Sequence, residues 1–193
     1  MDNKLKIINY LGKNKGKKFT MHELSSLINI PYATFHRTIS KMPDLIIKQK
    51  AGKATLIEIK VPNPIIKPYL AISSEEEKKE YLKKSPLISK ISSEIESNDI
   101  VILFGSYANK TENEKSDIDF MVINKDGRKS LSFSKYEVLF RKKINPIFIT
   151  EKEFKQMLKE KEENVGKQAL SNHIILNNPE KFWELVIDEN DKK

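Results

Sequence analysis

The chain has 193 residues, of which 38% are hydrophobic and 32% are charged, and it contains no cysteine. This composition is typical of a soluble globular protein with one or two small domains, and it excludes disulfide bonds and zinc–thiolate sites. No apolar run approaches the length of about 18 residues that a membrane-spanning helix needs. No signal peptide follows Met1, so we expect a cytoplasmic protein without a membrane partner.

The net charge of +8 is concentrated in the first third of the chain. Residues 1–60 carry 12 Lys and Arg against 4 Asp and Glu, whereas residues 61–193 carry 23 of each kind. A basic module joined to a neutral one is typical of a nucleic-acid-binding domain attached to a second domain. We therefore expect the two parts of the chain to have different partners.

Three helices are predicted first. Apolar residues three apart predict a helix over residues 4–11 that ends at Gly12. Thr20 and Glu23 form a capping box that opens a second helix. A third helix is predicted over residues 31–42, and its buried stripe consists of Phe35, Ile39 and Met42.

Residues 45–60 predict a β-hairpin with Gly52 at the turn. Three helices followed by a hairpin resemble a winged helix-turn-helix domain, so residues 1–60 are expected to bind DNA. The resemblance implies that the third helix enters the major groove, where Arg37 would read a guanine edge, and that the hairpin contacts the phosphate backbone. The residues expected to contact DNA are Tyr32, His36, Arg37, Lys41, Lys48, Lys50 and Lys53. The alternative is a protein–protein or dimerisation module with ordinary solvated lysines, and a homodimer is compatible with either reading.

Residues 61–74 contain three prolines and predict a stiff linker. Ser73 or Ser74 is expected to cap a helix with an acidic start and a basic end. The second domain is expected over residues 75–187, with a further helix beginning at Pro86, and the chain is expected to end in a loose tail over residues 188–193.

Two carboxylates mark the centre of this second domain. Residues 100–104 predict a buried strand, and Gly105 and Ser106 follow it directly. Such a corner can bring backbone N–H groups close to phosphate oxygens. Asp117 and Asp119 are two residues apart, so on a strand they face the same side. Adjacent carboxylates repel unless a cation lies between them, and oxygen ligands favour Mg²⁺ or Mn²⁺. The pattern predicts a site for metal-bound nucleoside triphosphate (NTP), and an exposed acidic turn is the alternative.

Gly-Ser, a short gap and Ser-Asp-Ile-Asp resemble the signature of the DNA polymerase β-like nucleotidyltransferase superfamily, particularly its minimal members. The resemblance implies that Gly105 and Ser106 bind the triphosphate, and that Asp117 and Asp119 are the catalytic metal ligands. Minimal members usually carry Ala-Arg-Gly after Gly-Ser-x, whereas this chain ends that triplet in Lys110. We expect Lys110 to replace the arginine as a phosphate contact.

The rest of the domain predicts alternating helices and strands. A helix is expected over residues 132–143, with Phe133, Tyr136, Leu139 and Phe140 facing the sheet. The next strand covers residues 144–149, and Pro146 indicates that it lies at a sheet edge. Thr150 and Glu153 form a capping box before another helix, and the chain closes with an apolar segment and a helix that buries Trp183.

The strand over residues 144–149 is where active relatives usually carry a third carboxylate. No acid occurs there in this chain, and Asn145 is the nearest match by position. A neutral amide is a poor metal ligand and no base. Glu137 or Glu151 would have to substitute for the third carboxylate through the folded geometry.

The predicted fold class is α+β, with a winged helix followed by a small mixed-sheet nucleotidyltransferase domain and its flanking helices. The expected function is transfer of a nucleoside monophosphate from an NTP, with Mg²⁺ or Mn²⁺, to a hydroxyl acceptor, combined with DNA binding. The missing third carboxylate favours an alternative, which is a catalytically weak or inactive nucleotide-sensing transcriptional regulator, or an antitoxin. The expected partners are DNA, NTP and a protein acceptor or toxin.

Overall fold

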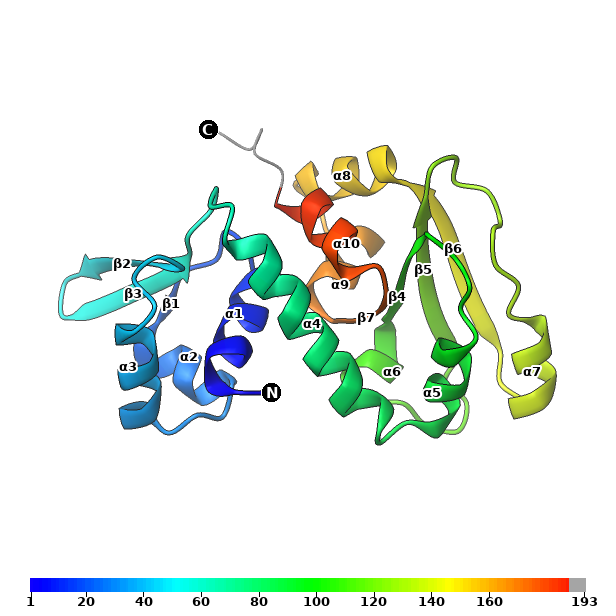
Figure 1. Cartoon of the computed structure of the whole chain (residues 1–193), viewed down its shortest axis with the longest axis horizontal. Helices are drawn as coiled ribbons and strands as arrows, with labels where there is room; N and C mark the ends of the chain where they lie inside the picture. Colours follow the sequence, from blue (N-terminus) through cyan, green and yellow to red (C-terminus); the bar gives the residue numbers. More distant parts are fainter. Residues whose placement is uncertain (188–193) are drawn as a thin grey trace. The chain divides into compact units, whose positions relative to one another are not determined.

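The computed structural model describes residues 1–187, and the predicted tail over 188–193 lies outside them. The described residues form two compact units, residues 1–73 together with Ile187, and residues 74–186 (Figure 1). Helices and two sheets occur together, so the predicted α+β class is confirmed. Among residues 1–187, no helix is both long and apolar enough to span a lipid bilayer.

The first unit contains the three predicted helices and the predicted hairpin. Its elements are α1 (Asn3–Lys13), β1 (Phe19–Thr20), α2 (Met21–Leu27), α3 (Tyr32–Ser40), β2 (Ile46–Ala51) and β3 (Ala54–Ile59). The strands form an antiparallel sheet in the order β1-β3-β2, and β1 was not expected from the sequence. The predicted capping box between Thr20 and Glu23 is present, and Phe35, Ile39 and Met42 are buried.

Two boundaries in this region differ from the sequence-based prediction. Helix α1 does not end at Gly12 but continues to Lys13, and the side chain of Asn14 donates to the carbonyl of Tyr10. The expected linker over residues 61–74 is only partly a linker, because α4 (Ile66–Leu82) begins within it. Pro68 lies in the first turn of α4, where a backbone N–H has no helical acceptor to lose.

The two serines expected to cap a helix lie inside α4 instead. Ser73 and Ser74 are buried, and Ser73 donates its hydroxyl hydrogen to the carbonyl of Leu70. The Ser74 hydroxyl accepts a hydrogen bond of 2.9 Å from the indole of Trp183, which is itself fully buried. The start of the acidic run suggested a cap, but packing against a tryptophan 109 positions later in the sequence decides the local structure. The boundary between the units falls between these serines, within α4.

The second unit is built on a four-stranded mixed sheet. Its elements after α4 are α5 (Pro86–Ser93), β4 (Ile100–Phe104), α6 (Gly105–Asn109), β5 (Ile118–Asn124), α7 (Ser134–Phe140), β6 (Ile144–Thr150), α8 (Glu151–Lys159), α9 (Val165–Ser171), β7 (His173–Asn177) and α10 (Pro179–Val186). The strand order within the described residues is β6-β5-β4-β7, in which β5 and β6 are parallel and the other neighbours are antiparallel. Pro146 therefore lies on an edge strand of the described sheet, as predicted.

Helices cover both faces of this sheet. In Figure 1, α8, α9 and α10 lie on one side of it, and α5 and α7 lie on the other. Ile118, Phe120 and Val122 of β5 point to the α5–α7 side and share a core with Phe133 and Tyr136. The prediction that Leu139 faces the sheet is wrong, because its side chain is 61% exposed. The predictions for Phe133, Tyr136 and Phe140 are confirmed, because all three pack in or against this core.

Candidate active site

The candidate site lies on one row of residues that crosses the sheet. Asn145 on β6 pairs with Asp119 on β5, Asp119 pairs with Phe104 on β4, and Phe104 pairs with His173 on β7. Side chains of directly paired residues project from the same face of a sheet. Side chains alternate along β5, so Asp119 and Phe120 project from opposite faces of the sheet. Phe120 lies on the α5–α7 side, and Asp119 therefore lies on the side covered by α8, α9 and α10.

The two aspartates converge on a single amide group. The side-chain nitrogen of Asn145 lies 3.1 Å from Oδ2 of Asp117 and 3.3 Å from Oδ1 of Asp119. The ammonium group of Lys143 lies 3.1 Å from the same Asp117 oxygen. The Asn145 hydrogen bond, followed by the Lys143 contact, lowers the pKa of Asp117 below its ordinary value. Both carboxylates are half-buried, so ligands from solvent can reach them.

Gly105 and Asp119 fit together closely. Gly105 has φ +70°, and a Cβ atom added to it would lie 2.4 Å from Oδ2 of Asp119. A side chain at this position would therefore be strained by the backbone and would displace the carboxylate. Ser106 follows as the second residue of α6. The predicted Gly-Ser corner and the predicted acidic pair are thus brought together.

The structure does not bring Lys110 into this group. Lys110 caps the C-terminal end of α6 with φ +57°, and its ammonium group lies 5.8 Å from the ring centroid of Tyr81. Sequence reasoning missed Lys143 instead. The position of Lys143, two residues before Asn145, could have indicated this contact. A side chain just before a parallel strand can reach the start of the neighbouring strand.

The donor set fits one hard cation better than two. Asp117 and Asp119 are the carboxylates that could supply oxygen ligands to such a cation, and Gly105 lies directly beside Asp119. Within residues 1–187, no group of three or more His, Cys, Asp or Glu side chains is placed to hold a metal ion. Asn145, which the sequence offers as the nearest match to a third carboxylate, contacts both aspartates through its amide nitrogen.

Neither glutamate suggested as a substitute reaches the pair. Glu137 accepts a hydrogen bond of 3.0 Å from the backbone N–H of Ile144, at the start of β6. Glu151 follows the other end of β6 and forms an ion pair of 2.8 Å with Lys181. Both carboxylates are therefore engaged elsewhere, and Asn145 stands in the third position without help from an acid.

A pocket of about 450 Å³ opens beside Gly105 and Asp119. Apolar side chains form part of its wall, and Gly105, amides, a hydroxyl and the Asp119 carboxylate form the rest. Its lining consists of Phe104, Gly105, Asn109, Asp119, Ile147, Val165, Gln168, Ser171 and Asn172. The second half of this wall belongs to α9, an element that sequence reasoning did not predict.

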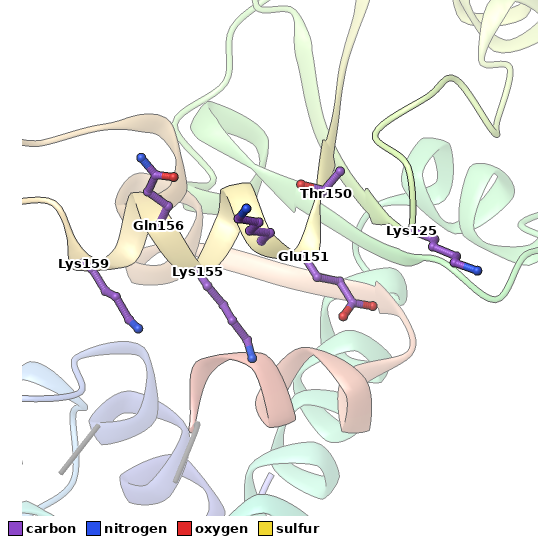
Figure 2. Close-up of a pocket in the computed structure, with 7 residues that line it drawn as sticks. Lys125, Thr150, Glu151, Lys155, Gln156 and Lys159 are labelled. Atoms are coloured by element: carbon purple, nitrogen blue, oxygen red, sulfur yellow. The ribbon is translucent and has the colours of Figure 1, made fainter. Parts of the chain in front are cut away.

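A second, larger pocket of about 750 Å³ has a different character (Figure 2). It is lined by Lys125, Thr150, Glu151, Lys152, Lys155, Gln156 and Lys159, so it lies past the ends of β5 and β6 that are remote from the aspartates. A capping box at this end of α8 joins Thr150 and Glu153, each side chain accepting a hydrogen bond from the backbone N–H of the other. The lining offers lysine side chains to an anion.

The residues predicted to contact DNA are exposed on the first unit. Tyr32, His36 and Arg37 lie on α3, and Lys41 caps its C-terminal end. The lysines of the hairpin lie on or between β2 and β3, namely Lys48, Lys50 and Lys53. The Tyr32 ring stacks on His22 of α2, with ring centroids 3.8 Å apart. The buried stripe of α3 points the other way, so the predicted contact residues lie on the exposed face of the helix.

Residues 87–181 match the family model described as "Polymerase beta, Nucleotidyltransferase". This part of the chain is therefore similar to nucleotidyltransferase domains of the DNA polymerase β-like type. The matched range runs from α5 into α10 and contains the Gly105 corner, both aspartates and Asn145. The resemblance inferred from the sequence signature is thereby supported for the second unit. No curated protein and no solved structure gives a significant match to the chain.

Proposed function

We propose that the nucleotidyltransferase domain binds a divalent metal–NTP complex and transfers its nucleoside monophosphate to a hydroxyl acceptor. The observation that carries this proposal is the approach of Asp117 and Asp119 to one point, directly beside Gly105. Two adjacent carboxylates next to a glycine corner are suited to a cation that is itself bound to phosphate. Mg²⁺ or Mn²⁺ would be held by the two aspartates and would neutralise charge on the phosphates.

In the proposed reaction, an oxygen of the acceptor hydroxyl attacks the α-phosphorus of the NTP. The bond between the α-phosphorus and the oxygen that bridges to the β-phosphate breaks, and pyrophosphate leaves. Gly105 and Ser106 orient the β- and γ-phosphates. The ammonium group of Lys143 lies beside Asp117, so it can also contact a phosphate oxygen of the bound NTP. The acceptor proton passes to solvent, because the side chain in the third position, Asn145, is not a base.

Asn145 also supports a second candidate function, which is nucleotide sensing without rapid transfer. Its amide supplies hydrogen bonds to both aspartates where a third carboxylate would supply negative charge. A site of this kind can bind metal–NTP and still lack the group that activates an acceptor. In this case the bound nucleotide would regulate what the first unit does.

We propose that the first unit is a winged helix that binds DNA. Its order of three helices and a hairpin, the exposed residues of α3, and the net charge of +8 on residues 1–60 support this proposal. Arg37 would contact a base edge, and Lys48, Lys50 and Lys53 would contact phosphates.

Two measurements on the full chain test these proposals. Titration calorimetry with each NTP and millimolar Mg²⁺ measures binding, and transfer of ³²P from [α-³²P]NTP to protein or nucleic-acid acceptors measures activity. The transferase proposal expects both, and both should be lost in the Asp117→Asn, Asp119→Asn double variant. Binding without transfer would favour the sensor, and absence of binding would refute both functions.

A further inference from the structure

The pocket beside Gly105 and Asp119 has a chemistry that the metal and phosphate groups do not explain. Among the described residues that line it, Asp119 alone has a charged side chain. A triphosphate that lay wholly inside the pocket would therefore find no cationic side chain to bind it. The pocket therefore fits a part of the ligand that is uncharged.

The wall formed by α9 is held in place from both of its ends. At the N-terminal end, the Asn164 side chain accepts from the backbone N–H of Lys167 and donates to the carbonyl of Met157 over 2.8 Å. Gly166 lies so close to α8 that an added Cβ would be 2.7 Å from Cβ of Met157. At the other end, Nδ1 of the buried His173 lies 2.8 Å from the carbonyl oxygen of Ala169. The wall is thus preformed and rigid.

The groups that line the pocket, from α9 and from the sheet, suit a nucleoside. Phe104, Ile147 and Val165 provide apolar surface against which a base can pack. Gln168 and Asn172 provide amides, each with donor and acceptor atoms, and both side chains are exposed to the pocket and to solvent. A volume of about 450 Å³ is within the range of small-molecule sites.

We propose that this pocket binds the nucleoside part of the NTP, with Gln168 and Asn172 hydrogen-bonding to the base or ribose and selecting among nucleotides. The inference rests on the proposed function, because it assumes that the phosphates lie at the Gly105 corner. Gly105 and Asp119 line the pocket and also form the metal–phosphate site, so a single ligand extends from one into the other. Its charged end lies at the aspartates and its neutral end lies against α9.

The experiment compares two ligands that share the phosphate tail. Calorimetry on the full chain measures the affinity for the preferred Mg–NTP and for Mg–tripolyphosphate, which lacks the nucleoside. Gln168→Ala and Asn172→Ala should each weaken NTP binding by about tenfold, the effect of one lost hydrogen bond of about 1.4 kcal/mol, and should leave tripolyphosphate binding within about twofold. Gln168→Glu, which keeps the shape and replaces donors by acceptors, should change the order of preference among the four NTPs.

Gln156→Ala is the matched control, because Gln156 is also an exposed helical amide but lines the other pocket (Figure 2). It should leave both affinities unchanged. NTP binding at wild-type strength in the Gln168 and Asn172 variants would overturn the inference, as would an equal loss for both ligands. Wild-type protein that binds neither ligand would instead refute the proposed function, and circular dichroism on each variant excludes unfolding as the cause of a loss.

Discussion

The carboxylate of Asp119 fills the space beside Gly105. A Cβ atom on any other residue at position 105 would collide with it. The two residues are fixed opposite each other by strand pairing, since Asp119 is the partner of Phe104, the residue immediately before Gly105. The corner and the acid are therefore one structural unit, and a change in either residue should be felt by the other.

Gly105→Ala should both destabilise the protein and impair NTP binding. The left-handed backbone at φ +70° costs an alanine about 1–2 kcal/mol, and displacement of the Asp119 carboxylate should lower Mg–NTP affinity by about tenfold or more. Gly127→Ala is the control, because Gly127 has φ +69° in the same unit but an added Cβ would be 3.3 Å from its nearest neighbour. Urea unfolding and calorimetry should show similar destabilisation in both variants and a binding defect only at Gly105. Equal binding in the two would contradict the role assigned to the corner.

Asn145→Asp should convert the amide bridge into a group of three carboxylates. Without divalent metal, the added charge should lower the melting temperature, because it lies about 3 Å from both aspartates. With millimolar Mg²⁺ or Mn²⁺, that loss should be reversed, and nucleotide transfer should rise by on the order of 100-fold if a base was the missing element. Gln156→Glu adds the same charge at an exposed site on α8 and should show neither effect. A variant indifferent to metal would show that the acids do not bind a cation.

The pH dependence of stability should contain a contribution from Glu94. This carboxylate accepts from Lys135 at 2.6 Å and from the Tyr136 hydroxyl at 2.7 Å, and it pairs with Lys90. The Lys135 hydrogen bond, followed by those of Lys90 and Tyr136, lowers the pKa of Glu94 from 4.5 to about 2. A lowered pKa stabilises the folded state above pH 4.5, and this stabilisation is lost as the pH falls from 4.5 towards 2.

Glu94→Gln should therefore lower the melting temperature at pH 7 and have little effect near pH 2. Differential scanning calorimetry across this range measures the difference between variant and wild type. Glu96→Gln, two residues away on an exposed side chain, is the control and should leave the curve unchanged. A Glu94 variant whose deficit is as large at pH 2 as at pH 7 would show that the carboxylate's charge is not responsible.

DNA binding through the first unit should depend on the lysines of the wing. Replacing Lys48, Lys50 and Lys53 by Ala should weaken binding of the full chain to duplex DNA and reduce the slope of log affinity against log salt by up to about 2.7, or about 0.9 for each phosphate contact. Arg37→Ala should reduce discrimination between sequences by about 1–3 kcal/mol. Fluorescence anisotropy at several salt concentrations measures both.

The matched control is a triple variant in which three lysines of the pocket in the second unit are replaced by Ala, namely Lys152, Lys155 and Lys159. It removes the same charge from a surface that we do not assign to DNA. If this variant loses as much affinity and salt dependence as the wing variant, DNA binding does not reside in the wing.

The hydrogen bond from Trp183 to Ser74 should contribute measurably to stability. Trp183→Phe leaves the buried Ser74 hydroxyl without its donor and removes part of a fully buried ring, so unfolding should cost about 2–4 kcal/mol less. Ser74→Ala alone should lower the free energy of unfolding by less than Trp183→Phe does. The double variant should lose less free energy of unfolding than the sum of the losses in the two single variants. Chemical denaturation followed by far-ultraviolet circular dichroism measures this coupling. Additive effects would show that the hydrogen bond has no energetic role.

The sequence was most informative where local chemistry decides the structure. Both capping boxes, the apolar strand before Gly105 and the edge position of Pro146 are as predicted, because each depends on neighbours within a few residues or on a missing N–H. The family match supports the reading of the Gly-Ser and Asp-x-Asp signature.

The sequence was least informative where distant residues meet. Burial of Ser74 under Trp183 could not be predicted from the residues around either one. Helix α9 lies in a polar stretch with little apolar periodicity, and its position depends on the fit of Gly166 against Met157. The contact of Lys143 with Asp117 follows from the register of β5 and β6, which the sequence does not specify.

The row of paired residues limits which insertions and deletions this domain can accept in evolution. The row consists of Asn145, Asp119, Phe104 and His173. Side chains along a strand alternate between faces, so inserting or deleting a single residue ahead of Asp119 within β5 would turn the acid towards the Phe120 core. Within β5, insertions or deletions should therefore be tolerated only in even numbers of residues. In the polar loop over residues 110–116, before the strand begins, any number should be tolerated. That loop is where we expect homologous chains to differ in length while their acids stay in place.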